Sequence, residues 1–166
     1  MKKRGFTLIE MMVVLTVISV LTGIVTFEIL DGVRQSRDAE RVADIHALQT
    51  AIELYKQRNG EYPEACNGPN AWSGQIDGDY KCSGTDPKYI VGLEPYLPVL
   101  PMDPELNGNS SGYMYVTNGD RSAYKVKANG TLETNVQDGG GCGEAANTFV
   151  LWGGFDSSGN SGCDLN

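Results

Sequence analysis

One carboxylate near the start of a long apolar run is the residue whose chemistry most needs an explanation. The run, residues 6–30, has only Glu10 and Glu28 as charged residues, and no Lys, Arg or His lies between residues 5 and 33. A carboxylate in a bilayer costs about 2.5–3.5 kcal/mol on insertion scales, so Glu10 needs a cation as its partner. Cleavage between Gly5 and Phe6 would create an amine at Phe6, which could pair with Glu10 of the next copy. The spacing therefore predicts a chain that polymerises.

Residues 6–30 are the element that must position this pair, and their length fits a membrane-spanning helix. About 20 predominantly apolar residues suffice to cross a bilayer, and three basic residues at positions 2–4 predict a cytoplasmic N-terminus. Everything after Asp31 is then exported. A cleaved secretory signal is one alternative, but the run lacks an A-x-A site and is longer than a usual signal. An ordinary uncleaved anchor is another, and it leaves Glu10 unexplained.

The helical pattern continues from residue 31 to residue 58, where apolar residues recur every three or four positions. The stripe consists of Ala39, Val42, Ile45, Leu48, Ile52 and Tyr55. Most charged residues of this segment, including Asp38 and Arg41, fall off the stripe, and Asn59-Gly60 is a typical helix end. We therefore expect one helix over residues 6–58, about 80 Å long at 1.5 Å per residue. Residues 6–30 form its apolar half and residues 31–58 its amphipathic half.

Charge and length describe an acidic, exported head on this helix. The chain has 166 residues, which predicts one domain plus the anchor. Its formal charge of −8 becomes −11 once the three basic residues at positions 2–4 are removed. An acidic domain argues against a primary nucleic-acid binder, which would show a basic patch. Two basic pairs, Lys56 with Arg58 and Lys125 with Lys127, are interpreted as solvated surface.

Four cysteines, Cys66, Cys82, Cys142 and Cys163, all lie on the predicted exported side, where disulfides persist. Three connectivities are possible. The local pairs 66–82 and 142–163 are favoured, because they would close two loops rich in Gly, Ser and Asp that have little apolar content. A zinc site is the rival interpretation, but no pair has the C-x2-4-C spacing and the lone His46 lies in a helical region.

The head, residues 59–166, begins with a long loop over 61–92 and a Pro-rich strip over 93–104. Prolines at a period of three in this strip favour a polyproline-II segment. A recognition motif stays open; packing of its apolar residues on the helix is favoured. Those residues are Leu97, Val99 and Leu100.

A β-sheet is predicted over about residues 112–152, followed by a C-terminal loop over 153–166. The expected strands are Tyr113–Val116, Ala123–Ala128, Thr131–Glu133 and Thr148–Trp152, which carry β-branched and aromatic residues. Asn129-Gly130 predicts a two-residue hairpin into the third of them. The fold class is therefore α+β: a long N-terminal helix packed on a small antiparallel sheet with disulfide-closed loops.

Residues 5–14, Gly-Phe-Thr-Leu-Ile-Glu-Met-Met-Val-Val, resemble the class III signal of type IV pilins and type II secretion pseudopilins. The resemblance implies the pilin fold, removal of residues 1–5 as a leader by the prepilin peptidase, and N-methylation of Phe6. It also implies that Phe6 and Glu10 act in subunit docking. Glu-Tyr-Pro at 61–63 and Leu-Pro-x-Asp-Pro at 100–104 resemble major pseudopilins and related major pilins.

No catalytic constellation is recognisable, so we do not expect an enzyme: the chain has one His and no G-x-S-x-G, phosphate loop or H-E-x-x-H motif. Calcium is the one cofactor to weigh. Residues 156–160 place oxygen donors at alternate positions but lack the Gly and the distant Glu of an EF-hand. The resemblance to major pseudopilins implies a calcium site in the C-terminal loop, with Asp156 and Asp164 as candidates. A polar loop closed by a disulfide is the simpler interpretation.

The favoured function is a structural subunit of a type IV pilus filament, which serves adhesion, motility or DNA uptake. Four cysteines and a long C-terminal region favour it. The alternative is the major pseudopilin of a type II secretion system, favoured by residues 61–63 and 100–104; a monomeric membrane-anchored binding protein is more remote.

Both filament functions imply the same kinds of partner and location. The partners are copies of the chain itself, the prepilin peptidase, an inner-membrane assembly platform with its ATPase, and minor pilins or pseudopilins. The chain would be a single-pass inner-membrane protein with its head outside the cytoplasm. It would then enter an extracellular pilus or a periplasmic pseudopilus.

Overall fold

A computed structural model of the chain describes residues 5–75, 80–82, 88–105, 112–134, 136, 141–145 and 147–165. Within its long helix, the side chains of residues 24–28 lie outside this description. Residues 1–4 of the predicted leader, which spans residues 1–5, lie outside it as well, as do parts of the predicted loop over 61–92. The chain divides into two compact units, Met1–Ser36 and Arg37–Asn166.

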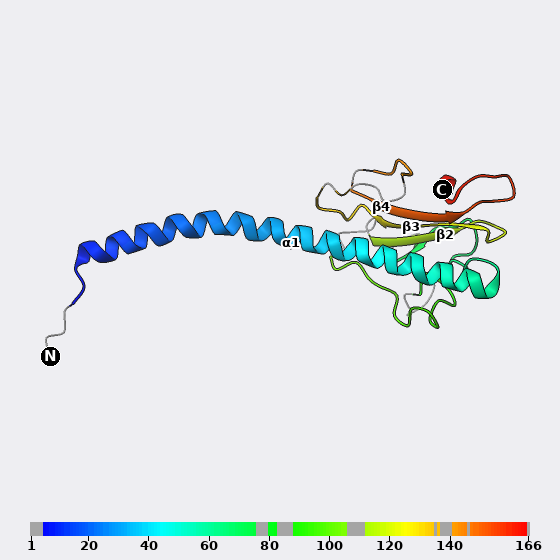
Figure 1. Cartoon of the computed structure of the whole chain (residues 1–166), viewed down its shortest axis with the longest axis horizontal. Helices are drawn as coiled ribbons and strands as arrows, with labels where there is room; N and C mark the ends of the chain where they lie inside the picture. Colours follow the sequence, from blue (N-terminus) through cyan, green and yellow to red (C-terminus); the bar gives the residue numbers. More distant parts are fainter. Residues whose placement is uncertain are drawn as a thin grey trace. The chain divides into compact units, whose positions relative to one another are not determined.

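One helix, α1, runs over Leu8–Asn59 (Figure 1). It begins after Thr7 and ends at Gly60, whose N–H donates to the carbonyl of Lys56 at 2.8 Å. Gly60 has φ of 83°, a left-handed conformation that ends helices and that glycine adopts without a Cβ clash. The helix is therefore stopped by the Asn59-Gly60 pair that the sequence singles out.

Over the residues whose side chains are described, no helix has the length and hydropathy needed to cross a membrane. The predicted membrane-spanning segment, residues 6–30, contains residues 24–28, which lie outside that description.

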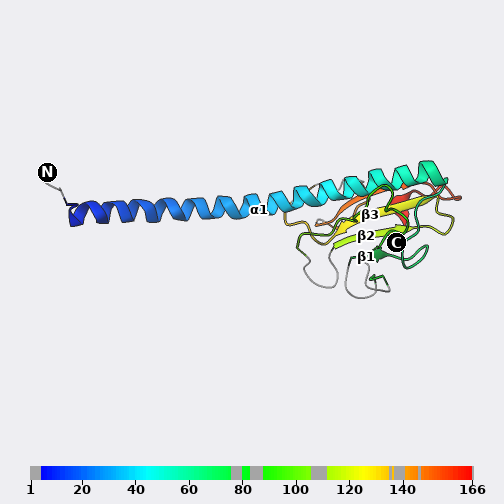
Figure 2. The ribbon, with the colours of Figure 1, turned by 90° about the horizontal axis from the view of Figure 1, so that it is seen from below.

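Four strands form one antiparallel sheet in the order β1-β2-β3-β4. They are β1 (Ser73–Gly74), β2 (Gly112–Thr117), β3 (Ala123–Asn129) and β4 (Phe149–Gly154), and a short 3-10 helix, η1 (Gly162–Asp164), follows. Residues 37–59 of α1 run along one face of this sheet (Figures 1 and 2). The predicted α+β class, a helix on a small antiparallel sheet, is confirmed.

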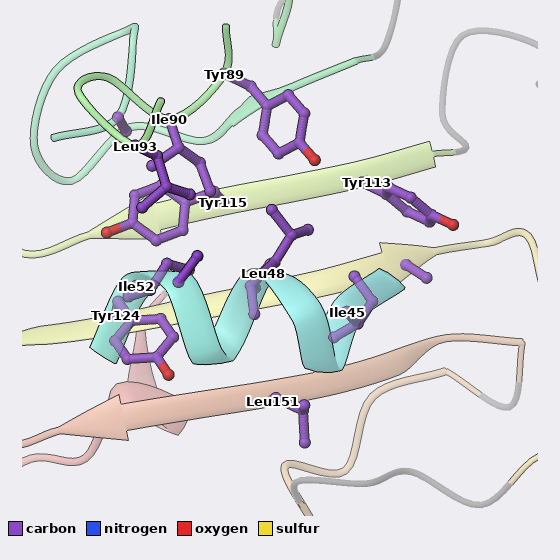
Figure 3. Close-up of a cluster of buried hydrophobic side chains, with 14 of the residues drawn as sticks. Ile45, Leu48, Ile52, Tyr89, Ile90, Leu93, Tyr113, Tyr115, Tyr124 and Leu151 are labelled. Carbon is purple, nitrogen blue, oxygen red and sulfur yellow. The ribbon is translucent and has the colours of Figure 1, made fainter. Parts of the chain in front are cut away.

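The main core lies between α1 and the sheet. Side chains from the helix stripe, from the inner face of the strands and from the loop before residue 94 pack together, and the buried members of this cluster are at most 9% exposed. Figure 3 shows the cluster: Ile45, Leu48, Ile52, Tyr89, Ile90, Leu93, Tyr113, Tyr115, Tyr124 and Leu151. The apolar stripe read from the sequence is thus the buried face of the helix from Ile45 to Ile52. Ala39, at its N-terminal end, is exposed.

The predicted hairpin at Asn129-Gly130 is wrong, because residues 131–133 form no strand. β3 pairs with β4 instead, with Ala128 opposite Phe149. Residues 131–134 turn toward α1, where the N–H groups of Glu133 and Thr134 donate to the carboxylate of Asp38. A two-residue turn would require the chain to return along β3, and these hydrogen bonds hold it on the helix.

The Pro-rich strip follows the prediction only in part. Leu97 and Leu100 are partly buried and pack against the core, as expected, but Val99 is 79% exposed, so its predicted packing on the helix is wrong. Residues 91–92 and 94–96 form turns, and the N–H of Leu97 donates to the carbonyl of Leu93 at 2.9 Å. The strip therefore turns before Val99, which lies exposed at the surface.

The interpretation of Lys125 and Lys127 as solvated surface is also wrong. Lys125 is 3% exposed and Lys127 is half-buried. Both ammonium groups pair with Glu144, at 2.8 Å and 3.3 Å. A lysine can be buried when its charge is paired in this way, and the paired acid is 17 residues or more away in the chain, which hides it from local pattern reading.

Candidate functional site

The segment Gly5–Glu10 has the geometry of a helix cap. Thr7 precedes the first helical residue, and its N–H and hydroxyl donate to Oε2 of Glu10 at 2.7 Å and 2.8 Å. The Glu10 N–H lies 3.3 Å from the hydroxyl oxygen of Thr7, which accepts its hydrogen bond. This reciprocal arrangement is a capping box, which pairs N–H groups that a helix leaves open at its start. The residues that the sequence marks as the assembly signature therefore also start the helix.

The bond between Gly5 and Phe6 lies in extended chain just before this cap, and it is accessible. Phe6 is 85% exposed, and a Cβ at Gly5 would meet no atom within 4 Å. A hollow of 390 Å³ next to it is lined by Phe6, Ile9, Glu10, Met11, Val13 and Val14. Almost the whole surface of this hollow is apolar, and Glu10 is among the residues that line it. It can accept an apolar side chain.

The first unit presents a continuous apolar surface. Large apolar side chains between residues 8 and 21 are each 49–79% exposed: Leu8, Ile9, Met11, Met12, Val13, Val14, Leu15, Val17, Ile18, Val20 and Leu21. Contiguous exposed apolar surface of this kind is typical of sites that contact lipid or another protein. Serine and threonine hydroxyls within it donate to helix carbonyls, as Ser19 does to Leu15 at 2.7 Å. These polar side chains therefore leave the surface apolar.

Disulfides join Cys66 to Cys82 and Cys142 to Cys163, the pairing favoured from the sequence. They close loops with separations of 16 and 21 residues. Loop closure of this size restricts the unfolded chain by about 3 kcal/mol in the chain-entropy account. One closed loop contains β1 and the other contains β4, so each disulfide restrains the segments that flank a strand.

The two calcium candidates, Asp156 and Asp164, act in separate turns. Asp156 accepts hydrogen bonds from the N–H groups of Ser158 and Asn160, each at 2.8 Å, and Asp164 accepts two from Ser161 at 2.9 Å. Among the described residues, no group of three or more His, Cys, Asp or Glu side chains could hold a metal ion. Calcium takes six to eight oxygen ligands, and the carboxylates of Asp156 and Asp164 accept hydrogen bonds within their own turns.

A buried arginine is the feature of the head that sequence reasoning missed. Arg41 and Asp38, on α1, are each 1% exposed. Arg41 donates to Asp38 at 2.8 Å, to Asp103 at 3.1 Å and to Glu133 at 3.0 Å. We name these four residues the Arg41 cluster. It joins α1 to the end of the Pro-rich strip and to the loop after β3, so three distant segments meet at one guanidinium.

Hydrogen bonds from outside the cluster complete it. Asp38 accepts from the N–H and hydroxyl of Thr134 at 2.7 Å and 2.6 Å, and Asp103 accepts from the N–H of Glu105 at 2.9 Å. Arg37 donates to Glu133 at 2.7 Å and lies 3.2 Å from Glu105. Because each buried carboxylate has several donors, the cluster meets the condition under which ions are tolerated in a protein interior.

These contacts shift the pKa values of the acids. The hydrogen bond from Arg37, with a further contribution from Arg41, lowers the pKa of Glu133 to about 2. Burial by itself would raise the pKa of Asp38, but the hydrogen bonds from Thr134, Glu133 and Arg41 lower it overall. Both groups are therefore ionised at neutral pH. With Asp38 and Glu133 held as carboxylates beside the Arg41 guanidinium, the cluster acts as a clamp between the three segments.

Two local signals point to this clamp. Asp38 and Arg41 have the i,i+3 spacing of a helical ion pair, and Asp103 lies in the Leu-Pro-x-Asp-Pro segment at residues 100–104. Neither signal shows that the pair is buried, since burial depends on the loops that arrive from residues 103 and 133.

Two family models match the chain. The prokaryotic N-terminal methylation motif matches residues 1–26, and the type II secretion system (T2SS), protein G, matches residues 28–148. The first match contains the segment Gly5–Glu10, and the second contains three of the four cysteines and the whole Arg41 cluster. No solved structure matches the chain.

Curated relatives carry the name type II secretion system core protein G. The protein from Vibrio cholerae serotype O1 is 33% identical over 140 residues, which cover 84% of this chain and 86% of the relative. The protein from Escherichia coli K12 is 32% identical over 130 residues, covering 78% and 82%. That from Pseudomonas aeruginosa is 30% identical over 130 residues, covering 78% and 86%. The resemblance to pilins and pseudopilins is thereby confirmed, and this chain belongs to the type II secretion system protein G family.

Proposed function

We propose that this chain is the major structural subunit of a type II secretion pseudopilus. The match of residues 28–148 to protein G is the observation that carries this proposal. It favours the pseudopilus, which was the alternative of the two predicted filament functions, over the type IV pilus. The cysteines that favoured a pilus close two loops of the head, and this role suits a subunit of either filament.

Assembly would use the segment Gly5–Glu10. Cleavage after Gly5 removes the leader and creates an amine at Phe6, which is then methylated. In the single chain the Glu10 carboxylate is held by two donors from Thr7. A carboxylate that already accepts neutral donors keeps a net negative charge, so the amine of a neighbouring copy adds a charge-assisted partner. The exposed apolar surface between residues 8 and 21 would pack against other copies in the filament core.

The partners and the location follow from this role. The chain would insert into the inner membrane through residues 6–30, with its acidic head in the periplasm. The prepilin peptidase, an assembly platform with its ATPase, and minor pseudopilins would act on it before and during polymerisation. The function is that of a structural subunit and involves no catalysis by this chain.

Deletion of the gene and imaging of sheared cells test the choice of filament. We expect deletion to block secretion of folded exported proteins, and we expect filaments of this chain only when it is overexpressed. Re-expression of the full chain is the control and should restore secretion. Long surface filaments at native expression, together with normal secretion in the deletion strain, would instead identify a type IV pilus subunit.

Calcium binding at Asp156 and Asp164 stays a prediction from the family resemblance. If calcium binds there, millimolar calcium will raise the melting temperature of the wild type, and Asp156→Ala will remove that rise. Because Asp156 caps its own turn, the variant also lowers the melting temperature without calcium, so the difference between plus and minus calcium is the quantity to compare. An unchanged melting temperature of the wild type in calcium would contradict the prediction.

A further inference from the structure

The sheet has a second buried face, opposite the one that packs on α1. Alternate residues of a strand point to opposite faces, and the registers align Val116 with Lys125 and Lys125 with Trp152. Val116 and Val150 are fully buried, yet neither belongs to the core cluster under the helix. We call this side of β2, β3 and β4 the outer face. Something other than α1 must exclude water from it.

Two chain segments provide that cover. Glu144 pairs with both lysines of the outer face, and the carbonyl of Leu165 accepts a hydrogen bond from Nζ of Lys125 at 3.0 Å. We define the strap as residues 141–145 together with residues 155–165. At Gly162 the strap approaches so closely that a Cβ would lie 2.2 Å from the carbonyl oxygen of Tyr124. The strap therefore lies directly on β3.

The strap depends on Cys142–Cys163 for its integrity. This disulfide joins its two segments, which contain η1 as their one helical turn and isolated bridge pairing between Phe155 and Ser161. The backbone hydrogen bonds of residues 156–165 close turns inside the strap, as from the N–H of Asp156 to the carbonyl of Asn160 at 2.9 Å, and hold it on itself. Regions with so little regular structure open locally at low free energy. The cross-link and the Glu144 ion pairs replace the secondary structure that is missing.

We propose that the strap is a redox-dependent cover: reduction of Cys142–Cys163 releases it from the outer face, while the core under α1 stays folded. Both of these cysteines are partly exposed, whereas in the other disulfide Cys66 is partly exposed and Cys82 is buried. The strap disulfide therefore offers a reductant two accessible sulfurs, and the other disulfide offers one. The core under α1 contains neither Cys142 nor Cys163, so it does not depend on this bond. This proposal does not rest on the pseudopilus assignment.

The chemistry is thiol–disulfide exchange with a dithiol. One thiolate of the dithiol attacks a strap sulfur, forms a mixed disulfide and releases the other cysteine as a thiolate, which takes up a proton. The second thiolate of the dithiol then displaces the remaining strap cysteine. Two electrons pass to the strap, and the reductant becomes a disulfide. In an exported compartment, a protein disulfide can take back the two electrons by the same steps in reverse. This exchange re-forms Cys142–Cys163 and closes the strap.

The two tryptophans of the chain report on this cover. Nζ of Lys127 lies 4.5 Å from the centroid of the Trp72 ring, and Trp152 lies on the outer face, 3.1 Å from a Cβ built at Gly162. Opening of the strap should therefore shift tryptophan emission to longer wavelength and increase its quenching by acrylamide. Circular dichroism reports whether the helix and the sheet stay folded, and this signal does not depend on tryptophan emission.

The experiment is a titration of the full chain in detergent with dithiothreitol, followed by thiol alkylation and mass mapping. We expect Cys142 and Cys163 to be labelled at a lower reductant concentration than Cys66 and Cys82. Tryptophan emission should shift in the same step, with the circular dichroism of the helix retained. A shift of emission only together with loss of the helix would overturn the proposal, as would labelling of Cys142 and Cys163 with unchanged emission.

Two variants sharpen the result. The double variant C142S/C163S should show the shifted emission without any reductant, and C66S/C82S is its matched control, which keeps the strap disulfide. If C142S/C163S does not fold, the titration of the wild type decides alone. Glu144→Gln keeps the disulfide but removes the charge that pairs with both lysines, so it should lower the reductant concentration at the transition. An unchanged transition in Glu144→Gln would contradict the role of these ion pairs.

Discussion

Glu10→Val will insert into the membrane more readily than the wild type and yet fail to enter filaments. Removing the carboxylate relieves about 2.5–3.5 kcal/mol of insertion cost. It also leaves the amine of the neighbouring Phe6 without its partner, and truncation of one member of a buried charge pair costs about 2–5 kcal/mol. That cost recurs at every subunit contact. The measurement is the fraction of variant chain in sheared filaments when it is co-expressed with the wild type.

Thr7→Val is the matched control for this result, because it removes the hydroxyl that caps the helix and leaves the Glu10 carboxylate in place. Loss of such a cap costs about 0.5–2 kcal/mol of helix stability, and we expect this variant still to enter filaments. Membrane extraction should show both variants inserted and cleaved. Normal incorporation of Glu10→Val would refute the pairing of amine and carboxylate, and equal failure of both variants would assign the effect to the cap.

Arg41→Met will destabilise the head much more than Arg34→Met, a matched substitution on the same helix. The methionine fills part of the space, but Asp38 and Asp103, at 1% and 6% exposure, lose their shared cation. Breaking a buried ion pair by removing one partner costs about 3–5 kcal/mol. For a chain of this size that corresponds to a fall in melting temperature of about 10 °C. The measurement is thermal unfolding of the full chain in detergent, followed by circular dichroism.

Arg34→Met is the control, since Arg34 lies on the same helix and pairs with Asp31 at 3.5 Å on the surface. An exposed pair of this kind contributes about 0–1 kcal/mol, so the melting temperature should hardly change. Equal effects of the two substitutions would show that the Arg41 cluster does not clamp the head. Proteolysis near residue 103 or residue 133 in Arg41→Met would identify the released loops.

The Arg41 cluster also predicts how the stability of the fold decreases at acidic pH. The pKa of Glu133 is lowered to about 2, and that of Asp38 is lowered as well. A carboxyl whose pKa is lower in the folded chain stabilises the fold fully above its unfolded pKa of about 4. That contribution is lost as the pH falls from about 4 toward 2. The clamp therefore remains intact through the neutral and mildly acidic range.

Local chemistry explains why much of the fold could be predicted. The stripe from Ile45 to Ile52 follows from a periodicity that any amphipathic helix must have, and Asn59-Gly60 stops the helix through backbone preferences of the residues themselves. Runs of β-branched and aromatic residues likewise located β2, β3 and β4 to within a few positions. The pairing of neighbouring cysteines followed from loop length and composition.

Predictions failed where a charged side chain pairs with residues that lie far away in the sequence. Asp38 and Arg41 fall off the apolar stripe, and Lys125 and Lys127 look like solvated surface, yet all four are buried or half-buried because acids or bases reach them from other segments. The hairpin at Asn129-Gly130 failed for the same reason. Its turn signal is strong, but the hydrogen bonds that Asp38 accepts from residues 133 and 134 hold the chain elsewhere.

Residue types and spacings along the chain were enough to predict a helix start at Gly5–Glu10, a long helix and an acidic head. Each of these depends on neighbours within a few turns of helix or strand. That Arg41 joins three segments, and that a strap covers the outer face of the sheet, depends instead on contacts between residues far apart in the chain. Burial of a charge is favourable only when all its partners arrive together, and no stretch of sequence contains them all.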